Sequence, residues 1–358
     1  MAVVHPKYKV AAVQAAPAFL DLDGSVEKAV RFIDEAGASR RPADRFSGKP
    51  GYPVTPGGSG SERRLGRSCV ASSRAISTIH SATTVRRRKS CAPLPIATRW
   101  WWCSASPSAT AAASILRQWI IAPDGETIAT RRKLKPTHAE RTVFGEGDGS
   151  HLAVHELDVG RLGALCCWEH LQPLSKYAMY AQNEQVHVAA WPSFSLYDPF
   201  AHALGAEVNN AASKIYAVEG SCFVIAPCAT VSQAMIDELC DTPEKHQFLH
   251  VGGGFAVIYG PDGAPLAPPL PPDQEGLLYA NIDLGMISVA KAAADPAGHY
   301  ARPDVTRLLF NNRPAHRVET LALPVDAEVK IDASGKAEAK PESKAPKVAP
   351  LAPVQAAE

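Results

Sequence analysis

A short apolar segment that leads into a helix, within residues 161–180, constrains the fold of this chain more than any other feature. Residues 162–166 are apolar throughout, and a run of this length is typical of a buried strand. Apolar residues then recur at helical spacing, at Leu171, Leu174, Tyr177 and Ala178. Alternating strand and helix patterns with clear turn signals extend over residues 116–325, which predicts an α/β domain.

Residues 8–35 and two later segments predict further elements. The stretch YKVAAVQAAP is typical of a buried strand, and VEKAVRFIDEAG after it predicts a helix. The segments WIIAPDGETIAT and FAVIYGPDGAPLA each place Pro-Asp-Gly between apolar runs, so we expect a hairpin at both. Residues 326–358 are rich in Ala, Lys, Pro and Glu without apolar periodicity, and this composition predicts a disordered tail.

The overall composition argues against several classes of protein. The formal net charge of +1 gives no reason to expect nucleic acid or an anionic membrane as a partner. The N-terminus lacks the pattern of a signal peptide, and no apolar run approaches the ~20 residues that cross a bilayer. The eight cysteines form no Cys-x-x-Cys pair, which favours a reducing cytoplasm over a disulfide framework or a zinc site. No residue spacing indicates a metal or an organic cofactor.

The segment from Ser39 to Ile115 differs from the rest of the chain. It carries eleven Arg and two Lys against only Asp44 and Glu62, and its apolar residues follow neither the helix nor the strand period. One interpretation is a basic, disordered insert that binds nucleic acid. That interpretation places a long unstructured loop inside a compact domain, which is uncommon. A frameshift explains the segment better.

The frameshift hypothesis rests on what shifted reading frames of the coding sequence permit. Joining the last base of each codon to the first two bases of the next, across residues 100–115, permits VVVLGFSERDGGSLY, which has the pattern of two strands and a polar turn. Between Arg40 and Lys49, the other shifted frame permits AGLRIAFPE. We therefore expect one domain over residues 1–325 in which residues 39–115 are out of frame, with chance as the alternative.

Two adjacent cysteines lie at the end of the apolar run: Cys166 is its last residue, and Cys167 follows directly. A cysteine at the sharp end of a strand that leads into a helix lies where a nucleophile is exposed and where the helix N-terminus favours the thiolate. Cys166 and Cys167 point to opposite faces, so at most one should be reactive, and Cys167 is the candidate nucleophile. The alternative is that both thiols are buried packing residues, as free cysteines usually are.

A second candidate group lies in RRKLKPTHAERTVFGEGDG, residues 131–149. We expect Lys133 and Lys135 on the same side of an extended segment, with Glu140 after a Pro-containing turn. A lysine beside a thiolate lowers the pKa of the thiol and stabilises charge in a tetrahedral intermediate. A glutamate there can move protons or hold the lysine in place. The alternative is a solvated, basic strand end.

Four stretches resemble one family: KVAAVQAAP, RRKLKPTHAERTVFGEGDGS, GALCCWEHLQPLSKYAMYAQNEQVHVAAWPSFSLY and DPAGHYARPDV. They are similar to the nitrilase branch of the carbon–nitrogen hydrolases, and Cys-Trp-Glu-His at 167–170 distinguishes nitrilases from related amidases and carbamoylases. CCWEHLQPLSKYA and AAWPSFSLY are most similar to arylacetonitrilases. The resemblance implies a four-layer αββα sandwich and a cytoplasmic enzyme that hydrolyses an organic nitrile to a carboxylic acid and ammonia.

The resemblance also implies a Glu–Lys–Cys catalytic triad. The family's cysteine, which precedes Trp-Glu-His, falls on Cys167, and its lysine falls on Lys133 in the Arg-Lys-Leu-Lys-Pro run. A second glutamate, which supports the lysine, falls on Glu140. The general-base glutamate belongs to a Phe-Pro-Glu strand end near residue 48, where this chain has Gly48 and Lys49. The printed chain therefore lacks its base and a βα section of the core.

Five further residues are candidates for supporting or substrate-binding roles: Trp168, Glu169, His170, His138 and Trp191. The two tryptophans are candidates for an aromatic substrate pocket, with core packing as an equal alternative for Trp191. The two histidines are expected to be structural hydrogen-bonding residues. The resemblance implies no cofactor, and dimers that extend into spiral homo-oligomers, with residues 295–305 in subunit contacts. An amidase or carbamoylase of the same superfamily and a catalytically inactive protein are the alternatives.

Overall fold

The computed structural model describes residues 5–38, 68–71, 102–110, 113–196, 198 and 200–316, and two β-sheets lie at their centre. The first sheet has eight strands in the order β11-β1-β2-β3-β4-β5, with β13 paired to β1 and β6 paired to β4. Its strands are β1 (Lys7–Ala15), β2 (Ser68–Ala71), β3 (Trp102–Thr110), β4 (Ala113–Ile121), β5 (Thr127–Arg132), β6 (Phe144–Gly145), β11 (Cys228–Ala229) and β13 (Gly276–Asp283).

The second sheet has five strands in the order β12-β10-β9-β8-β7. Its three central strands are parallel to one another, and both outer strands are antiparallel to their neighbours. These strands are β7 (His155–Leu157), β8 (Gly160–Cys166), β9 (Val186–Ala190), β10 (Phe223–Ala226) and β12 (Val257–Tyr259). β9 is buried along its whole length, as expected for a parallel strand that is covered on both faces.

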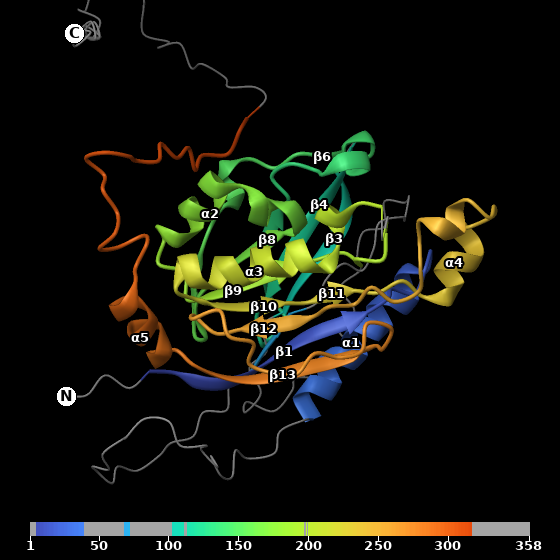
Figure 1. The fold of residues 1–358 in the computed structure, drawn as a ribbon, viewed down its shortest axis with the longest axis horizontal. Coiled ribbons are helices and arrows are strands. Elements are labelled where there is room, and N and C mark those ends of the chain that lie inside the picture. Colours follow the sequence, from blue (N-terminus) through green and yellow to red (C-terminus); the bar gives the residue numbers. More distant parts are fainter. Residues whose placement is uncertain are drawn as a thin grey trace, which may run out of the picture. The chain divides into compact units, whose positions relative to one another are not determined.

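Helices cover the outer faces of the two sheets (Figure 1). α1 contacts β13 and β2 of the first sheet, whereas α3 contacts β10 and β12 of the second sheet and packs against α2. The helices are α1 (Leu22–Ala38), α2 (Pro173–Tyr180), α3 (Ala206–Gly220), α4 (Gln233–Leu239) and α5 (Gly285–Ala293). The shorter 3-10 helices are η1 (His138–Thr142), η2 (Gly149–His151), η3 (Cys167–Leu171), η4 (His202–Leu204) and η5 (Lys245–Gln247).

The main hydrophobic core lies between the sheets and under α3. Val10 of β1 and Leu278 of β13 belong to the same buried cluster as Leu162, Val188 and Ile225 of the second sheet. Strands of the two sheets contact each other directly, as β1 with β10 and β12 with β13. The layers are therefore α1, the first sheet, the second sheet and the α2–α3 pair, which confirms the predicted αββα sandwich.

Several elements lie where the sequence places them. β1 and α1 coincide with the predicted N-terminal strand and helix. The first Pro-Asp-Gly turn joins β4 to β5, with Gly125 at φ 87°. The second follows β12, where Tyr259 pairs with Pro265 and Gly263 has φ 78°. Both hairpins are confirmed, since glycine adopts these positive φ angles without the steric cost of a side chain.

The prediction that Leu171, Leu174, Tyr177 and Ala178 form the apolar face of one helix after β8 is wrong in part. The structure has two helices there, because Gln172 is extended between η3 and α2 and interrupts the helical phase. Leu174 is 69% exposed, whereas the residues of α2 that are buried are Ala178, Met179 and Tyr180. The helix thus packs through its last turn.

The segment of residues 39–115 is described only in part. β2 lies between β1 and β3, and β3 pairs with β4 from Trp102↔Ile121 to Thr110↔Ala113. The positions near residue 48, where the Phe-Pro-Glu strand end is predicted, lie outside the described residues. The backbone does not report the reading frame of the coding sequence, so the frameshift stays a prediction. Residues 326–358, predicted as a disordered tail, also lie outside the described residues.

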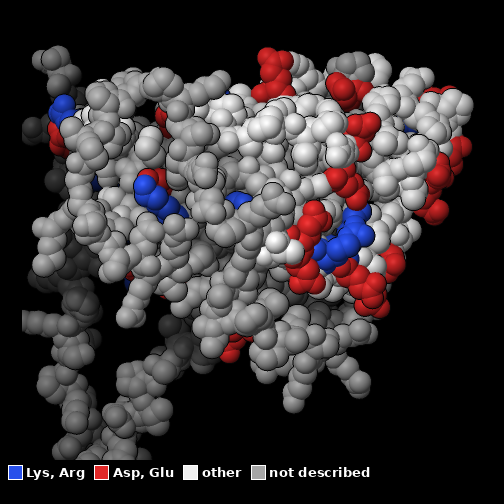
Figure 2. Space-filling view, turned by 90° about the horizontal axis from the view of Figure 1, so that it is seen from below, with Lys and Arg blue, Asp and Glu red and all other residues white. Residues whose placement is uncertain are grey.

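The described part of the chain offers no large basic surface in the view of Figure 2, where acidic side chains are widespread and basic ones lie beside them. The described residues between His5 and Ala315 belong to one compact unit. Within the described ranges, no helix is long and apolar enough to cross a membrane.

Candidate active site

Cys167 lies where β8 ends and η3 begins. Its backbone has φ 55°, in the left-handed region, which costs a non-glycine residue about 1–2 kcal/mol. Such conformations persist where surrounding contacts determine them, and they cluster at functional sites. The predicted position at a sharp strand end is therefore confirmed. The expectation of an exposed side chain is wrong, because only 7% of Cys167 is exposed.

The other buried cysteines of the main core are Cys166, Cys222 and Cys228. Cys166 is 2% exposed and packs in the same cluster as Cys167. Burial raises the pKa of Cys228 to about 12, and its thiol donates to the carbonyl of Pro192 at 3.2 Å. Burial also raises the pKa of Cys222. Cys228 and Cys222 are thus kept as neutral thiols, which are poor nucleophiles.

Lys133 directly follows β5, and its side chain is only 1% exposed. Its Nζ lies 2.5 Å from Oε2 of Glu140, and that oxygen also accepts the backbone N–H of Thr137 at 2.8 Å. The backbone of Lys133 donates to the carbonyl of Leu116 and accepts from Gly147, both at 2.9 Å. Because a buried ammonium is stable only beside a partner, Glu140 holds the lysine in place. This is one of the two roles predicted for that glutamate.

Lys135 does not share the surroundings of Lys133, so the expectation that both lie on one side of an extended segment is wrong. The chain bends at residues 134–135, immediately after β5. The Lys135 side chain is 64% exposed and forms an ion pair with exposed Glu146. The bend directs one lysine into the interior and the other into solvent.

Glu169, in η3, forms a buried ion pair with Arg131 of β5. Oε1 lies 2.6 Å from the Arg131 guanidinium, and both side chains are 4% exposed. Burial alone would raise the pKa of Glu169, but the charge and hydrogen bond of Arg131 outweigh it, with further help from two backbone N–H donors. The pKa of Glu169 is therefore lowered, and the residue is held as a carboxylate.

The same carboxylate joins the two candidate catalytic segments. Oε1 of Glu169 accepts the backbone N–H of Leu134, and Oε2 accepts that of Cys166, each at 2.7 Å. These two donors are the direct chain neighbours of Lys133 and Cys167. The Cys-Trp-Glu-His sequence thus includes the residue that fixes the position of one candidate segment relative to the other.

Arg131 and Gln118 are site residues that sequence reasoning missed. A second nitrogen of Arg131 donates to Oε1 of Gln118 at 2.8 Å, and Nε2 of Gln118 donates to the carbonyl of Leu165 at 3.1 Å. This contact links β4 of the first sheet to β8 of the second. The sequence signal that could have identified Gln118 is its position as a polar residue inside the apolar strand SILRQWII.

A buried chain of polar side chains lies behind Cys167. The carbonyl of Cys167 is 2.7 Å from Nδ1 of His170, and Nε2 of His170 is 2.9 Å from Nε2 of His187. His187 contacts Glu184 at 2.7 Å, and Glu184 accepts the Tyr216 hydroxyl at 2.5 Å. His170 is a structural hydrogen-bonding residue, as predicted. The other three were missed, although His187 interrupts the apolar strand VHVAA.

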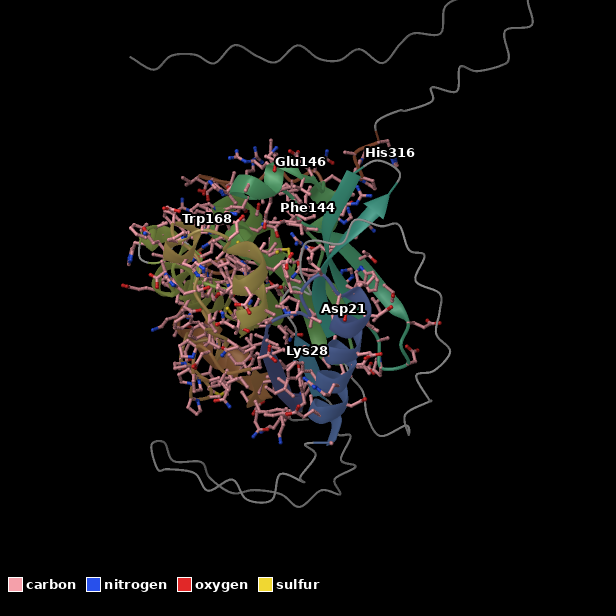
Figure 3. The ribbon with its side chains drawn as sticks, turned by 90° about the vertical axis from the view of Figure 1, so that its right-hand side faces the viewer. Asp21, Lys28, Phe144, Glu146, Trp168 and His316 are labelled. Atoms are coloured by element: carbon pink, nitrogen blue, oxygen red, sulfur yellow. The ribbon has the colours of Figure 1, made fainter. Side chains whose placement is uncertain are left out.

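The remaining candidate residues lie apart from this group or in the core. Trp191 is 1% exposed and donates to Ser213 at 2.8 Å, which places it in the core. Trp168 is half-buried, and Figure 3 shows it on the opposite side of the two sheets from Lys28 of α1. His138 is exposed at the start of η1. Of the two tryptophans, only Trp168 retains surface for contact with a substrate.

Within the described residues, no group of three or more His, Cys, Asp and Glu side chains is arranged to hold a metal ion.

The αββα sandwich thus carries a strained cysteine at a strand end and a buried Lys–Glu pair, on two segments that the Glu169 carboxylate joins. A model of the carbon–nitrogen hydrolase family matches residues 83–292, which is more than half of the chain. The chain therefore belongs to the carbon–nitrogen hydrolase family. The match begins within residues 39–115, whose reading frame stays a prediction.

Curated relatives belong to the nitrilase branch of that family. A nitrilase from Pseudomonas syringae pv. syringae is 51% identical over 327 residues, which cover 89% of this chain and 95% of the relative. An aliphatic nitrilase from Rhodococcus rhodochrous is 41% identical, covering 89% and 87%. An arylacetonitrilase from Aspergillus kawachii is 36% identical, covering 89% and 97%. The chain is thus a member of the nitrilases, as its Cys-Trp-Glu-His sequence indicates.

Solved structures show the same fold. The structure of a carbon–nitrogen hydrolase from Helicobacter pylori G27 matches with a TM-score of 0.59 and 14% sequence identity, covering 84% of this chain and 97% of that one. At this level of identity the match concerns the fold alone, and it agrees with the αββα layers described above.

Proposed function

We propose that this chain hydrolyses an organic nitrile of the arylacetonitrile type to the carboxylic acid and ammonia, with Cys167 as the nucleophile. One observation carries the proposal: Cys167 stands in a strained, left-handed conformation on a segment that Glu169 ties to the Lys133–Glu140 pair. A nucleophile and a cationic group fixed relative to each other are what addition to a carbon–nitrogen multiple bond requires.

The proposed reaction has two additions of water. The general-base glutamate takes the proton from Cys167, the sulfur attacks the nitrile carbon, and the proton is delivered to the nitrile nitrogen, which forms a covalent thioimidate. Water adds to the thioimidate, ammonia leaves, and a thioester remains. A second water cleaves the thioester, releases the acid and restores the thiol. The Lys133 ammonium stabilises the negative nitrogen or oxygen that develops at each addition, and Glu140 holds that ammonium.

The general base of this reaction is part of the frameshift proposal. The family's Phe-Pro-Glu glutamate falls near residue 48, where the printed chain has Gly48 and Lys49. We assign the base to the glutamate of AGLRIAFPE, which the shifted frame restores. A chain with the printed residues 39–115 is expected to lack activity, because no base then takes the thiol proton.

The test, made on the protein expressed from a coding sequence with the restored reading frame, is the release of ammonia from phenylacetonitrile, compared with an aliphatic nitrile and with phenylacetamide. Cys167→Ala should abolish release, whereas Cys166→Ala, the adjacent buried cysteine, should retain it. Preference for the aliphatic nitrile contradicts the proposed substrate class, and preference for the amide identifies an amidase instead. Activity that survives Cys167→Ala contradicts the assignment of the nucleophile.

We further propose that the protein acts in the cytoplasm and assembles into dimers and longer spiral homo-oligomers. Exposed apolar side chains on two helices support assembly: Ile215 and Val218 on α3, and Met286 and Val289 on α5. Residues 295–305 follow α5 and are the segment expected in subunit contacts. Light scattering coupled to size-exclusion chromatography tests this, and a monomer at micromolar concentration contradicts it.

A further inference from the structure

The proposed reaction leaves four buried polar side chains behind Cys167 without a role. His170, His187 and Tyr216 are 0% exposed, and Glu184 is 2% exposed. They come from η3, the turn before β9, β9 itself and α3, and they form a single line of contacts that ends on the carbonyl of Cys167. Burying four polar groups is costly unless each is matched to a partner.

The hydrogen-bond chemistry gives this line one direction. A carbonyl oxygen only accepts, so Nδ1 of His170 carries the proton that is donated to Cys167. In neutral His170, Nε2 is then the acceptor, and Nε2 of His187 must donate to it. In neutral His187, Nδ1 is in turn the acceptor, so Glu184 must donate through a protonated carboxyl. The Tyr216 hydroxyl completes the line as donor to the other oxygen of Glu184.

The electrostatic surroundings favour these neutral forms. Burial raises the pKa of Glu184 to about 8, against smaller opposite effects of Tyr216 and Arg131. Burial lowers the pKa of His170 to about 3, with His187 as the next cause. Burial also lowers the pKa of His187 and raises that of Tyr216. A carboxylic acid and two neutral imidazoles are therefore the expected state near neutral pH.

Both imidazoles pack against aromatic rings. The ring of His187 stacks on Tyr216 with centroids 3.8 Å apart, and the ring of His170 lies 5.0 Å from that of Trp191. Gly163 of β8 leaves room for Glu184, since a Cβ atom at this position would lie 2.0 Å from its Oε1. The line is thus fixed in place by both sheet and helix.

We propose that Tyr216, Glu184, His187 and His170 form a neutral, one-directional hydrogen-bond chain that positions the nucleophile by anchoring the carbonyl of Cys167. The left-handed backbone at φ 55° needs such an anchor, because a non-glycine residue does not stay there without fixed partners. All four are positioning residues, acting on the reaction only through Cys167. The inference rests on the proposed function for its link to catalysis, but the anchoring can be measured without a nitrile.

A matched pair of substitutions at one position tests the anchor. The amide nitrogen of Asn occupies roughly the place of imidazole Nδ1, whereas that of Gln occupies roughly the place of Nε2. His170→Asn should therefore still donate to Cys167 and keep most of the kcat. His170→Gln should lower kcat about 100-fold with little change in KM, as expected when a nucleophile is displaced without loss of substrate binding. Equal losses in both variants overturn the proposal.

The protonated carboxyl is tested at Glu184. Glu184→Gln reproduces the proposed pattern, because its amide donates to His187 while its oxygen accepts from Tyr216, so kcat should stay within about threefold of the wild type. Glu184→Ala should lose activity as His170→Gln does. If Glu184→Gln is as impaired as Glu184→Ala, the carboxyl is ionised and the neutral chain is refuted.

The rate at which iodoacetamide alkylates Cys167 separates this inference from the proposed function. The rate is read by intact mass, against Cys167→Ala as background, well below the unfolding temperature of each variant. It should fall in His170→Gln and remain near that of the wild type in His170→Asn. If the wild type turns over no nitrile but shows this pattern, the proposed function fails and the positioning chain stands. If alkylation is the same in both variants, the positioning chain fails whatever the activity.

Discussion

The Glu169 clamp leads to a quantitative prediction for Glu169→Gln. The substitution keeps the shape of the side chain but removes the charge that is paired with Arg131, with both residues 4% exposed. It also exchanges one carboxylate oxygen for an amide nitrogen. In the wild type, the two oxygens of Glu169 accept the N–H groups of Leu134 and Cys166 and the Arg131 guanidinium. The amide nitrogen of the variant cannot accept a hydrogen bond, so at least one of these contacts is lost.

The expected cost follows from what remains in the interior. Removing one partner of a buried ion pair typically costs about 3–5 kcal/mol, because the other charge loses its compensation. For a domain of this size, 1 kcal/mol corresponds to roughly 2 °C in Tm, so the melting temperature should fall by roughly 6–10 °C. The kcat should fall as well, because the Lys133 and Cys167 segments are no longer held together.

The assay is thermal unfolding followed by near-ultraviolet circular dichroism, with Glu146→Gln as the matched control. Glu146 makes the same kind of ion pair with Lys135, but on the surface, and its loss should change the free energy of unfolding by no more than about 0.5 kcal/mol. Arg131→Met added to Glu169→Gln should recover part of the loss by removing the uncompensated charge. A melting temperature for Glu169→Gln equal to that of Glu146→Gln would refute the clamp.

Three further predictions concern the lysine, the buried acid and the coding sequence. Lys133→Met should lower kcat by about 10²–10³-fold, whereas Lys135→Met, at the exposed lysine, should leave it nearly unchanged; equal losses contradict the assignment. Because the folded-state pKa of Glu184, about 8, lies above its ordinary value of 4.5, its stabilising effect is complete below pH 4.5 and is lost as the pH rises through 8. Between pH 6 and 8 the wild type should therefore lose roughly 2 kcal/mol of unfolding free energy relative to Glu184→Gln, measured by urea titration, and a constant difference contradicts a buried neutral acid. Resequencing the DNA across codons 35 to 120 should restore Phe-Pro-Glu and SERDGGSLY, and an active enzyme with the printed frame would show that the frameshift proposal is wrong.

Local patterns were sufficient to predict the elements that depend on local chemistry. The buried-strand pattern of YKVAAVQAAP and the helix pattern of VEKAVRFIDEAG predicted β1 and α1, and Pro-Asp-Gly predicted both hairpins. The strand that ends immediately before Cys167 was predicted for the same reason. The phase of α2 was not, because the extended conformation of Gln172 interrupts the helix, and no periodicity reports a single extended residue.

The candidate site likewise has some features that local patterns predict and others that depend on the packing of distant elements. The residues alone were enough to select the Cys-Trp-Glu-His and Arg-Lys-Leu-Lys-Pro stretches as candidates for chemistry and to place Cys167 at the end of a strand. The fold was needed to show that Lys133 is buried beside Glu140 while Lys135 faces solvent, since one bend after β5 separates them.

The partners of the buried polar residues were also decided by tertiary structure alone. Arg131 and Glu169 lie 38 positions apart in the chain, and Glu184 and Tyr216 lie 32 apart. Their contacts exist because the two sheets and α3 pack against one another around a common core. A polar residue inside an apolar strand reports that a partner is needed, but the partner is chosen by the packing of distant elements, which no local pattern contains.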